Sequence, residues 1–319
     1  MADPEAPIRL SELAEQARVP RALTDRGRKE RFGDTRDLKI APGQVWRAAW
    51  DDVSLLVLIT RPVHEPDVGV IPLTVEPNIA NDRSLIIGPS HTAFGVEATL
   101  LIDLQSVVPL RVLDEIIDEW TADVLNALLP TASVLTQPPL GIRRGNPVET
   151  EFDRSLSVMA EIEDDLETLH STAALPVETG RGQATRTLAS VLGKNANLMA
   201  LMTALEPLGL GQPEVMKLMR GKRPMTPEIV DAVSDATGVD RELVEETVQP
   251  LPVELVIEVD HPKWRTYWKE QAQQEQTDEF SVRLQTSYEV FALAARQTGV
   301  QQPDWPARIA QYRTARKKV

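Results

Sequence analysis

Lysine and arginine side chains gather in one stretch of an otherwise acidic chain, and their chemistry there is that of phosphate binding. Between Arg181 and Pro224 the sequence holds seven lysines and arginines but only two acids. The whole chain has a net charge of −14, so its overall field repels a polyanion. Nucleic acid would therefore bind through such a local concentration of positive charge. The seven cations are Arg181, Arg186, Lys194, Lys217, Arg220, Lys222 and Arg223.

The segment that follows carries the opposite charge. Residues 225–246 contain seven acids and one arginine, Arg241, so the positive charge is confined to the stretch before it. Three interpretations stay open for that stretch. It contacts DNA, it is the solvated basic face of an ordinary helical bundle, or it binds an acidic protein partner.

The residues at 183–247 predict helices joined by a tight turn. Residues 197–208 have the apolar spacing of a helix, and Gly209 and Gly211 bracket one leucine in the turn that follows. Pro213 suits the first turn of a short second helix, PEVMKLMR.

Further helix boundaries follow in close order. Gly221 predicts the end of the short helix, and Thr226 with Pro227 and Glu228 predicts the start of the next. That helix is expected to stop at Gly238, and Asp240 caps another.

The string GLGQPEVMKLMRGKRPMTPEIVDAVSDATGVDRELV resembles the helix-turn-helix of the Xre/Cro repressor family. In that family the helix before the Gly-Lys-Arg segment enters the major groove of DNA. The preceding helix is longer and more apolar here than is usual in the family, which keeps an ordinary helical hairpin open as the alternative. The resemblance implies that Gln212, Glu214 and Lys217 face bases and that Arg220, Lys222 and Arg223 hold phosphates, with Lys194 in the same DNA-binding set.

Short runs rich in valine, isoleucine and leucine predict strands before this region. They lie at 55–60, 68–75, 84–88 and 99–110, separated by glycine, proline, asparagine and aspartate, as in a small β-barrel. Residues 111–129 then have helical spacing, and Thr121 suits the N-cap of a second helix.

The order of these runs resembles the MazF/PemK family of toxin ribonucleases, which have a small SH3-like barrel. The resemblance rests on Gly43 to Trp46, Leu56 to Leu58, Pro72 to Thr74, and Gln105. The family places a catalytic arginine in the loop before the Leu-Val-Leu strand, where this chain has only AAWDDVS. We therefore expect a catalytically silent barrel, because neither Arg47 nor Arg83 occupies the family's position.

The sequence predicts an α+β multidomain protein: a small N-terminal SH3-like β-barrel followed by an all-α region that contains a helix-turn-helix. Three prolines and two glycines mark a linker at 131–148, and Pro130 directly precedes it. The expected parts are an N-terminal arm at 1–38 with a basic run from Arg21 to Arg31, the barrel at 39–130, the linker at 131–148, a connecting helix within 149–182, the helix-turn-helix domain at 183–250 and a helical region at 251–319.

Several kinds of chemistry lack support in the sequence. The chain has no cysteine, which excludes disulfides and thiolate metal sites, and no two of its four histidines have metal-ligand spacing. We expect no metal and no cofactor. The sequence also has no signal peptide and no membrane span, so we expect a cytoplasmic protein without a membrane partner. The aromatic and basic residues at 260–269 either stack on bases or pack against a neighbouring helix.

The function that these patterns favour is that of a prokaryotic transcriptional regulator from a toxin–antitoxin or phage-defence locus. It would bind double-stranded DNA as a homodimer, with a toxin or antitoxin protein as a further partner. The alternatives are a MazF/PemK-like endoribonuclease fused to a regulatory domain and a protein-interaction module.

Overall fold

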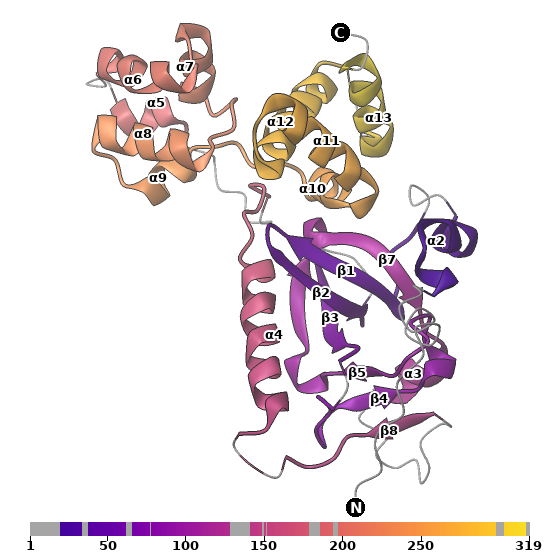
Figure 1. Ribbon diagram of the computed structural model, residues 1–319. Coiled ribbons are helices and arrows are strands. Elements are labelled where there is room, and N and C mark those ends of the chain that lie inside the picture. Colours follow the sequence, from indigo (N-terminus) through magenta and orange to yellow (C-terminus); the bar gives the residue numbers. More distant parts are fainter. Residues whose placement is uncertain are drawn as a thin grey trace, which may run out of the picture. The chain divides into compact units, whose positions relative to one another are not determined.

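The computed structural model describes residues 20–33, 38–61, 66–76, 78–127, 141–148, 150, 152–178, 186–193, 197–297 and 303–316. The chain divides into two compact units, Met1–Ser171 and Thr172–Val319. The first unit is built on an antiparallel sheet and the second is helical, which confirms the α+β prediction (Figure 1).

The described residues of the first unit form an eight-stranded sheet in the order β7-β1-β2-β3-β5-β4-β8. The strand β6 pairs with the start of β3, and β5 pairs with its end, so these two share one edge of β3. The strands are β1 (Gln44–Trp50), β2 (Val53–Ile59), β3 (Asp67–Thr74), β4 (Leu85–Ile87), β5 (Ala98–Leu100), β6 (Ser106–Pro109), β7 (Leu113–Glu119) and β8 (Ile142–Arg144).

The predicted runs at 55–60, 68–75 and 84–88 correspond to β2, β3 and β4, whereas the run at 99–110 is divided into β5 and β6. The sheet does not close into the expected barrel, because its outer strands β7 and β8 have no ladder between them in the described residues. The strands β4, β5 and β8 are three residues each, which is short for the staggered pairing that closure requires.

The prediction of a helix over 111–129 is wrong for the first half of that range, where a short 3-10 turn, η4 (Leu110–Val112), leads into β7. In the ladder with β1, the partners of Ala48 and Trp46 are Leu113 and Ile116, and the register shifts twice. Such irregularities break the two-residue alternation of a strand, so buried positions three apart imitate helical spacing. The second half is helical, and α3 (Ala122–Ala127) begins directly after Thr121, as predicted.

The expected linker at 131–148 contains β8, which pairs with β4. Ile142 is buried in the core of the first unit, so a sequence rich in proline and glycine still contributes a short strand. The prolines at 130, 138 and 139 lie outside the described residues.

The connecting helix expected within 149–182 is α4 (Arg154–His170), and it belongs to the first unit (Figure 1). Asp153 caps it by accepting a hydrogen bond from the backbone N–H of Ser155 at 2.8 Å. The helix packs against β2 and β6 instead of connecting two domains. Phe152 precedes the helix and is 88% exposed.

The basic run at 21–31 is anchored to the sheet and is not a solvated arm. It forms η1 (Arg21–Leu23) and α2 (Asp25–Phe32). Arg28 lies 2.6 Å from the carboxylate of Glu115, and Arg31 pairs with the buried Asp118. These contacts attach α2 to β7, while the first nineteen residues of the expected arm lie outside the described part of the chain.

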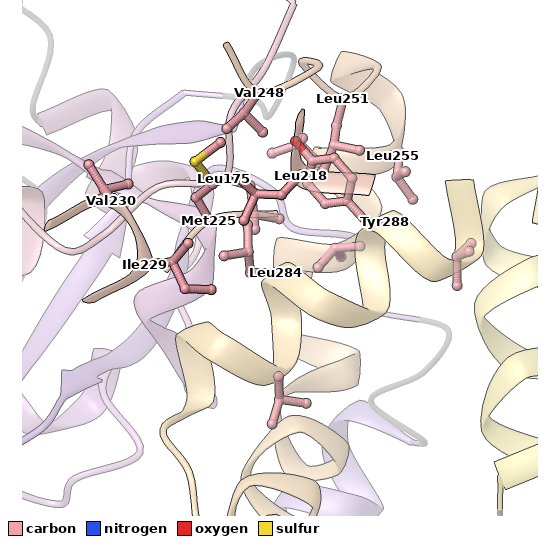
Figure 2. Packing of buried hydrophobic residues seen from close by; sticks show 14 of the residues in the cluster. Leu175, Leu218, Met225, Ile229, Val230, Val248, Leu251, Leu255, Leu284 and Tyr288 are labelled. Carbon is pink, nitrogen blue, oxygen red and sulfur yellow. The ribbon is translucent and has the colours of Figure 1, made fainter. Parts of the chain in front are cut away.

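The second unit packs its helices around one hydrophobic cluster. Figure 2 shows part of this cluster, to which α7 contributes Leu218, α8 contributes Ile229 and α12 contributes Tyr288. The elements are α5 (Leu188–Leu192), α6 (Leu198–Leu205), η7 (Glu206–Leu208), α7 (Gln212–Met219), α8 (Pro227–Thr237), α9 (Arg241–Glu245), α10 (Val253–Asp260), η8 (Pro262–Trp264), α11 (Arg265–Glu275), α12 (Glu279–Gln297) and α13 (Trp305–Arg316). Within the part of the chain that the structure describes, every helix is too short or too polar to cross a bilayer.

The aromatic residues at 260–269 belong to this core. Trp264, Tyr267 and Trp268 are all buried, and the indole N–H of Trp268 donates to the carbonyl of Val259 at 3.0 Å. The stretch therefore packs against neighbouring helices, and its rings are not available to stack on bases.

His261 makes the stability of the second unit depend on pH. Its Nδ1 accepts a hydrogen bond from the backbone N–H of Lys263 at 3.2 Å, which requires an unprotonated nitrogen. Burial, and secondarily the charge of Lys263, lowers the pKa of His261 to about 4 from an ordinary 6.5. As the pH falls from 6.5 towards 4, the imidazole of His261 binds a proton in the unfolded chain but not in the folded chain. Up to about 3 kcal/mol of the free energy of unfolding is therefore lost.

We expect His261→Asn to remove this loss, because asparagine keeps a hydrogen-bond acceptor but does not titrate. The measurement is urea unfolding, followed by circular dichroism, at pH 7 and pH 4.5 for both proteins. Equal losses of stability in the two proteins would contradict the assignment to His261.

Candidate nucleic-acid interface

The candidate interface begins with α6 and the turn that follows it. The Asn197 side chain caps α6 by accepting from the backbone N–H of Ala200 at 3.1 Å. At the other end the backbone N–H groups of Gly209 and Leu210 donate to the carbonyls of Glu206 and Leu205, at 3.0 and 3.2 Å. This is a Schellman motif with Gly209 at a φ of 73°, and it reverses the chain before α7.

The helix α7 ends in the same way. The N–H of Gly221 donates to the carbonyl of Leu218, and that of Lys222 donates to the carbonyl of Lys217, both at 2.9 Å. Gly221 takes the left-handed conformation, with a φ of 67°. Lys222 and Arg223 therefore leave the helix directly after its last turn.

One face of α7 is buried and the other is exposed. Val215 and Leu218 point into the hydrophobic cluster, three residues apart. Gln212, Lys217 and Arg220 are exposed, and Lys222 is exposed just beyond the helix. We name the exposed set Gln212, Pro213, Lys217, Arg220 and Lys222 the α7 face. It combines an amide with three cations, the side-chain chemistry that binds base edges and phosphates.

Glu214 occupies a different environment from its neighbours on α7. Its Oε1 accepts a hydrogen bond from Nζ of Lys217 at 2.8 Å, and its Oε2 is paired with Nη1 of Arg223. The hydrogen bond from Lys217 is the main cause that holds the pKa of Glu214 below its ordinary value, so the carboxylate is charged at neutral pH. The resemblance placed Glu214 against bases and Arg223 against phosphates, whereas here these two side chains bind each other.

The acids after α7 lie on the surface of α8 and α9. Thr226 and Asp240 occupy the predicted N-cap positions, although neither side chain makes a capping hydrogen bond. Arg241 bridges Asp231 and Glu245, at 2.5 and 3.1 Å. The single cation of this surface is thus surrounded by carboxylates, and the surface stays negative.

No protein-family model and no curated protein matches this chain.

Not every predicted residue can be placed. Lys194 and Arg181 lie outside the described residues, while Arg186 is exposed just before α5. The spacing of three between Glu214 and Lys217 is a sequence signal for a pair on one helix. The pairing of Glu214 with Arg223 depends on how the chain turns at Gly221, and no sequence spacing indicated it.

The sheet offers no cation where the ribonuclease resemblance needs one. The strands β1 and β2 pair from Trp50 and Val53, so only two aspartates, Asp51 and Asp52, connect them. Arg47 is paired with Asp114, and Arg83 with Asp103 at 3.1 Å. No group of acids and histidines suited to a metal ion occurs among the residues that the structure describes.

Proposed function

We propose that the chain is a sequence-specific double-stranded DNA-binding protein, a transcriptional regulator of the Xre type, with α7 as the helix that enters the major groove. The observation that carries this proposal is the α7 face, where an exposed amide and three exposed cations lie on one short helix and on the turn that ends it. The rest of the chain is strongly acidic, so this face is where a duplex is attracted.

The dimensions of α7 suit that role. An α-helix with its side chains is about 10–12 Å in diameter, which fits the major-groove width of about 12 Å, and the eight residues of α7 form about two turns. In this proposal Gln212, at its start, binds an adenine edge, and Lys217, five residues later, binds a guanine. Arg220 and Lys222, at its end, bind backbone phosphates.

The acidic surface of α8 and α9 supports a single orientation on DNA, because phosphates repel it while the α7 face attracts them. We extend the proposal to a homodimer on a palindromic site, since proteins of this motif class read two half-sites related by a twofold axis. The proposed setting is a prokaryotic toxin–antitoxin or phage-defence locus, with a toxin or antitoxin protein as a further partner.

The full-length protein is expected to enrich a duplex motif from a random DNA library. On that duplex, Lys217→Ala should lower the preference over random DNA roughly tenfold. Arg220→Ala and Lys222→Ala should each weaken binding to both duplexes and reduce the slope of log affinity against log salt by about 0.9. Fluorescence anisotropy at several salt concentrations measures both quantities.

Arg241→Ala is the matched control, because Arg241 is an exposed cation held by acids on the surface of α8 and α9. It should leave the salt slope unchanged. If Arg241→Ala reduced the salt slope as much as Arg220→Ala, the assignment of α7 as the DNA-binding helix would be wrong. Recovery of RNA in place of a duplex motif would refute the proposal in favour of the ribonuclease alternative.

A further inference from the structure

The cations near the end of α7 are not equivalent. Arg220 and Lys222 are exposed, whereas Lys217 and Arg223 are both held by one carboxylate, that of Glu214. Arg223 folds back from beyond Gly221 to the first turn of α7, and its side chain and that of Glu214 are each 30% exposed. The side chain of Lys217 is 58% exposed, so a phosphate can reach it without rearrangement of the core.

We infer that Glu214 is an internal counter-ion that holds Lys217 and Arg223, lowers the affinity for every duplex and does not read a base. This role rests on the proposed DNA-binding function and deepens it. A carboxylate near the interface repels phosphates, and each cation that it holds must leave it before it can bind one. Because this cost is the same for all sequences, it weakens specific and non-specific binding alike and leaves discrimination to the α7 face.

The geometry separates this role from base reading. To accept a hydrogen bond from a cytosine amino group, Glu214 would have to turn its carboxylate away from Arg223, the partner of its Oε2. That movement would leave the guanidinium of Arg223, whose buried Nε already has no hydrogen-bond partner, without its carboxylate.

The test is Glu214→Gln, which keeps the shape of the side chain and removes its charge. We expect affinity for the enriched duplex and for random DNA to rise together, by roughly threefold to tenfold at 0.1 M salt. The salt slope should steepen by about 0.9 for each cation released. Glu206→Gln is the matched control, since it removes an exposed acid from η7 that holds neither Lys217 nor Arg223. It should leave the slope unchanged.

If Glu214→Gln instead weakens the enriched duplex and changes the preference at one base pair, Glu214 reads a base and the inference is overturned. An equal effect of Glu206→Gln on the slope would overturn it as well, because the change would then reflect net charge alone.

A thermal double-mutant cycle tests the ion pair without DNA. Glu214→Gln and Arg223→Gln should each lower Tm. The Tm of the double variant should be no lower than that of the less stable single variant. Additive shifts would overturn the inference even where DNA binding holds. If the wild type binds no duplex, the proposed function fails and the role of Glu214 fails with it, while non-additive shifts would show that the ion pair itself is real.

Discussion

Asp260→Leu is expected to destabilise the helical unit by about 3–5 kcal/mol, because it leaves an uncompensated positive charge in a buried group of charged side chains. The side chains of Asp260 and Arg283 are 0% and 1% exposed, and Asp260 Oδ1 lies 3.1 Å from Nη1 of Arg283. Glu279 accepts from Nε of Arg283 at 3.0 Å and lies 3.5 Å from Nε of Arg265. Two acids and two arginines thus form one neutral group where α10, α11 and α12 meet.

The control for this prediction is the double variant Asp260→Leu/Arg283→Met. It restores neutrality, since Glu279 and Arg265 still face each other. We therefore expect it to be more stable than Asp260→Leu alone, although it replaces two residues and not one. Urea unfolding followed by the helical circular-dichroism signal measures both. A double variant less stable than Asp260→Leu alone would show that the arginine contributes mainly through its packing.

The helices around the candidate interface could be predicted because the residues that start and end them lie at the boundaries themselves. Gly209, Gly221 and Gly238 each take a positive φ at the end of a helical segment, and Pro227 stands at the start of α8. Each of these signals acts on residues within one turn, so no knowledge of the rest of the fold is needed.

The strand β7 could not be predicted, because its apolar spacing depends on irregular pairing with β1. Leu113 and Ile116 are partners of residues two apart on β1, and only the ladder shows this. The attachment of α2 is a similar case, since Arg31 and Asp118 are 87 positions apart in the sequence. Single-sequence patterns contain no information about such distant pairs.

Sequence patterns indicated the residue types of the candidate site but not the ion pair within it. The residue types on α7 indicate phosphate and base chemistry, and the helical period places Lys217 and Arg220 together, one turn apart. The ion pair between Glu214 and Arg223 spans the Gly221 turn, so the sequence grouped both residues with those that face DNA. The roles of Gln212, Lys217, Arg220 and Lys222 stay predictions.

Gly221→Ala should destabilise the helical unit by about 2–4 kcal/mol. The left-handed conformation of Gly221, with a φ of 67°, costs an alanine about 1 kcal/mol. In addition, a Cβ at this position would lie 2.7 Å from the backbone oxygen of Thr247, which is buried. The Gly221 carbonyl also accepts from the N–H of Gln249 at 3.2 Å, so the two segments cannot separate without loss of a hydrogen bond.

The chain provides two matched controls for this prediction. Gly209 and Gly238 have φ values of 73° and 70°, and a Cβ at either position would meet nothing within 4 Å. Gly209→Ala and Gly238→Ala should therefore cost only the conformational term of about 1 kcal/mol, and the excess for Gly221→Ala measures the clash. Equal losses in the free energy of unfolding for all three variants, measured with urea, would mean that the segment at Thr247 moves away from the added Cβ without cost.

The same contact connects the candidate interface to the helical core. Gln249 donates its N–H to Gly221, and its carbonyl accepts from the hydroxyl of Tyr288 in α12 at 2.5 Å. Gly221 therefore fixes the point from which Lys222 and Arg223 leave α7, relative to a buried helix. A Cβ there should lower affinity for the enriched duplex as well as stability, whereas Gly238→Ala, at the C-terminal end of α8, should leave DNA binding unchanged.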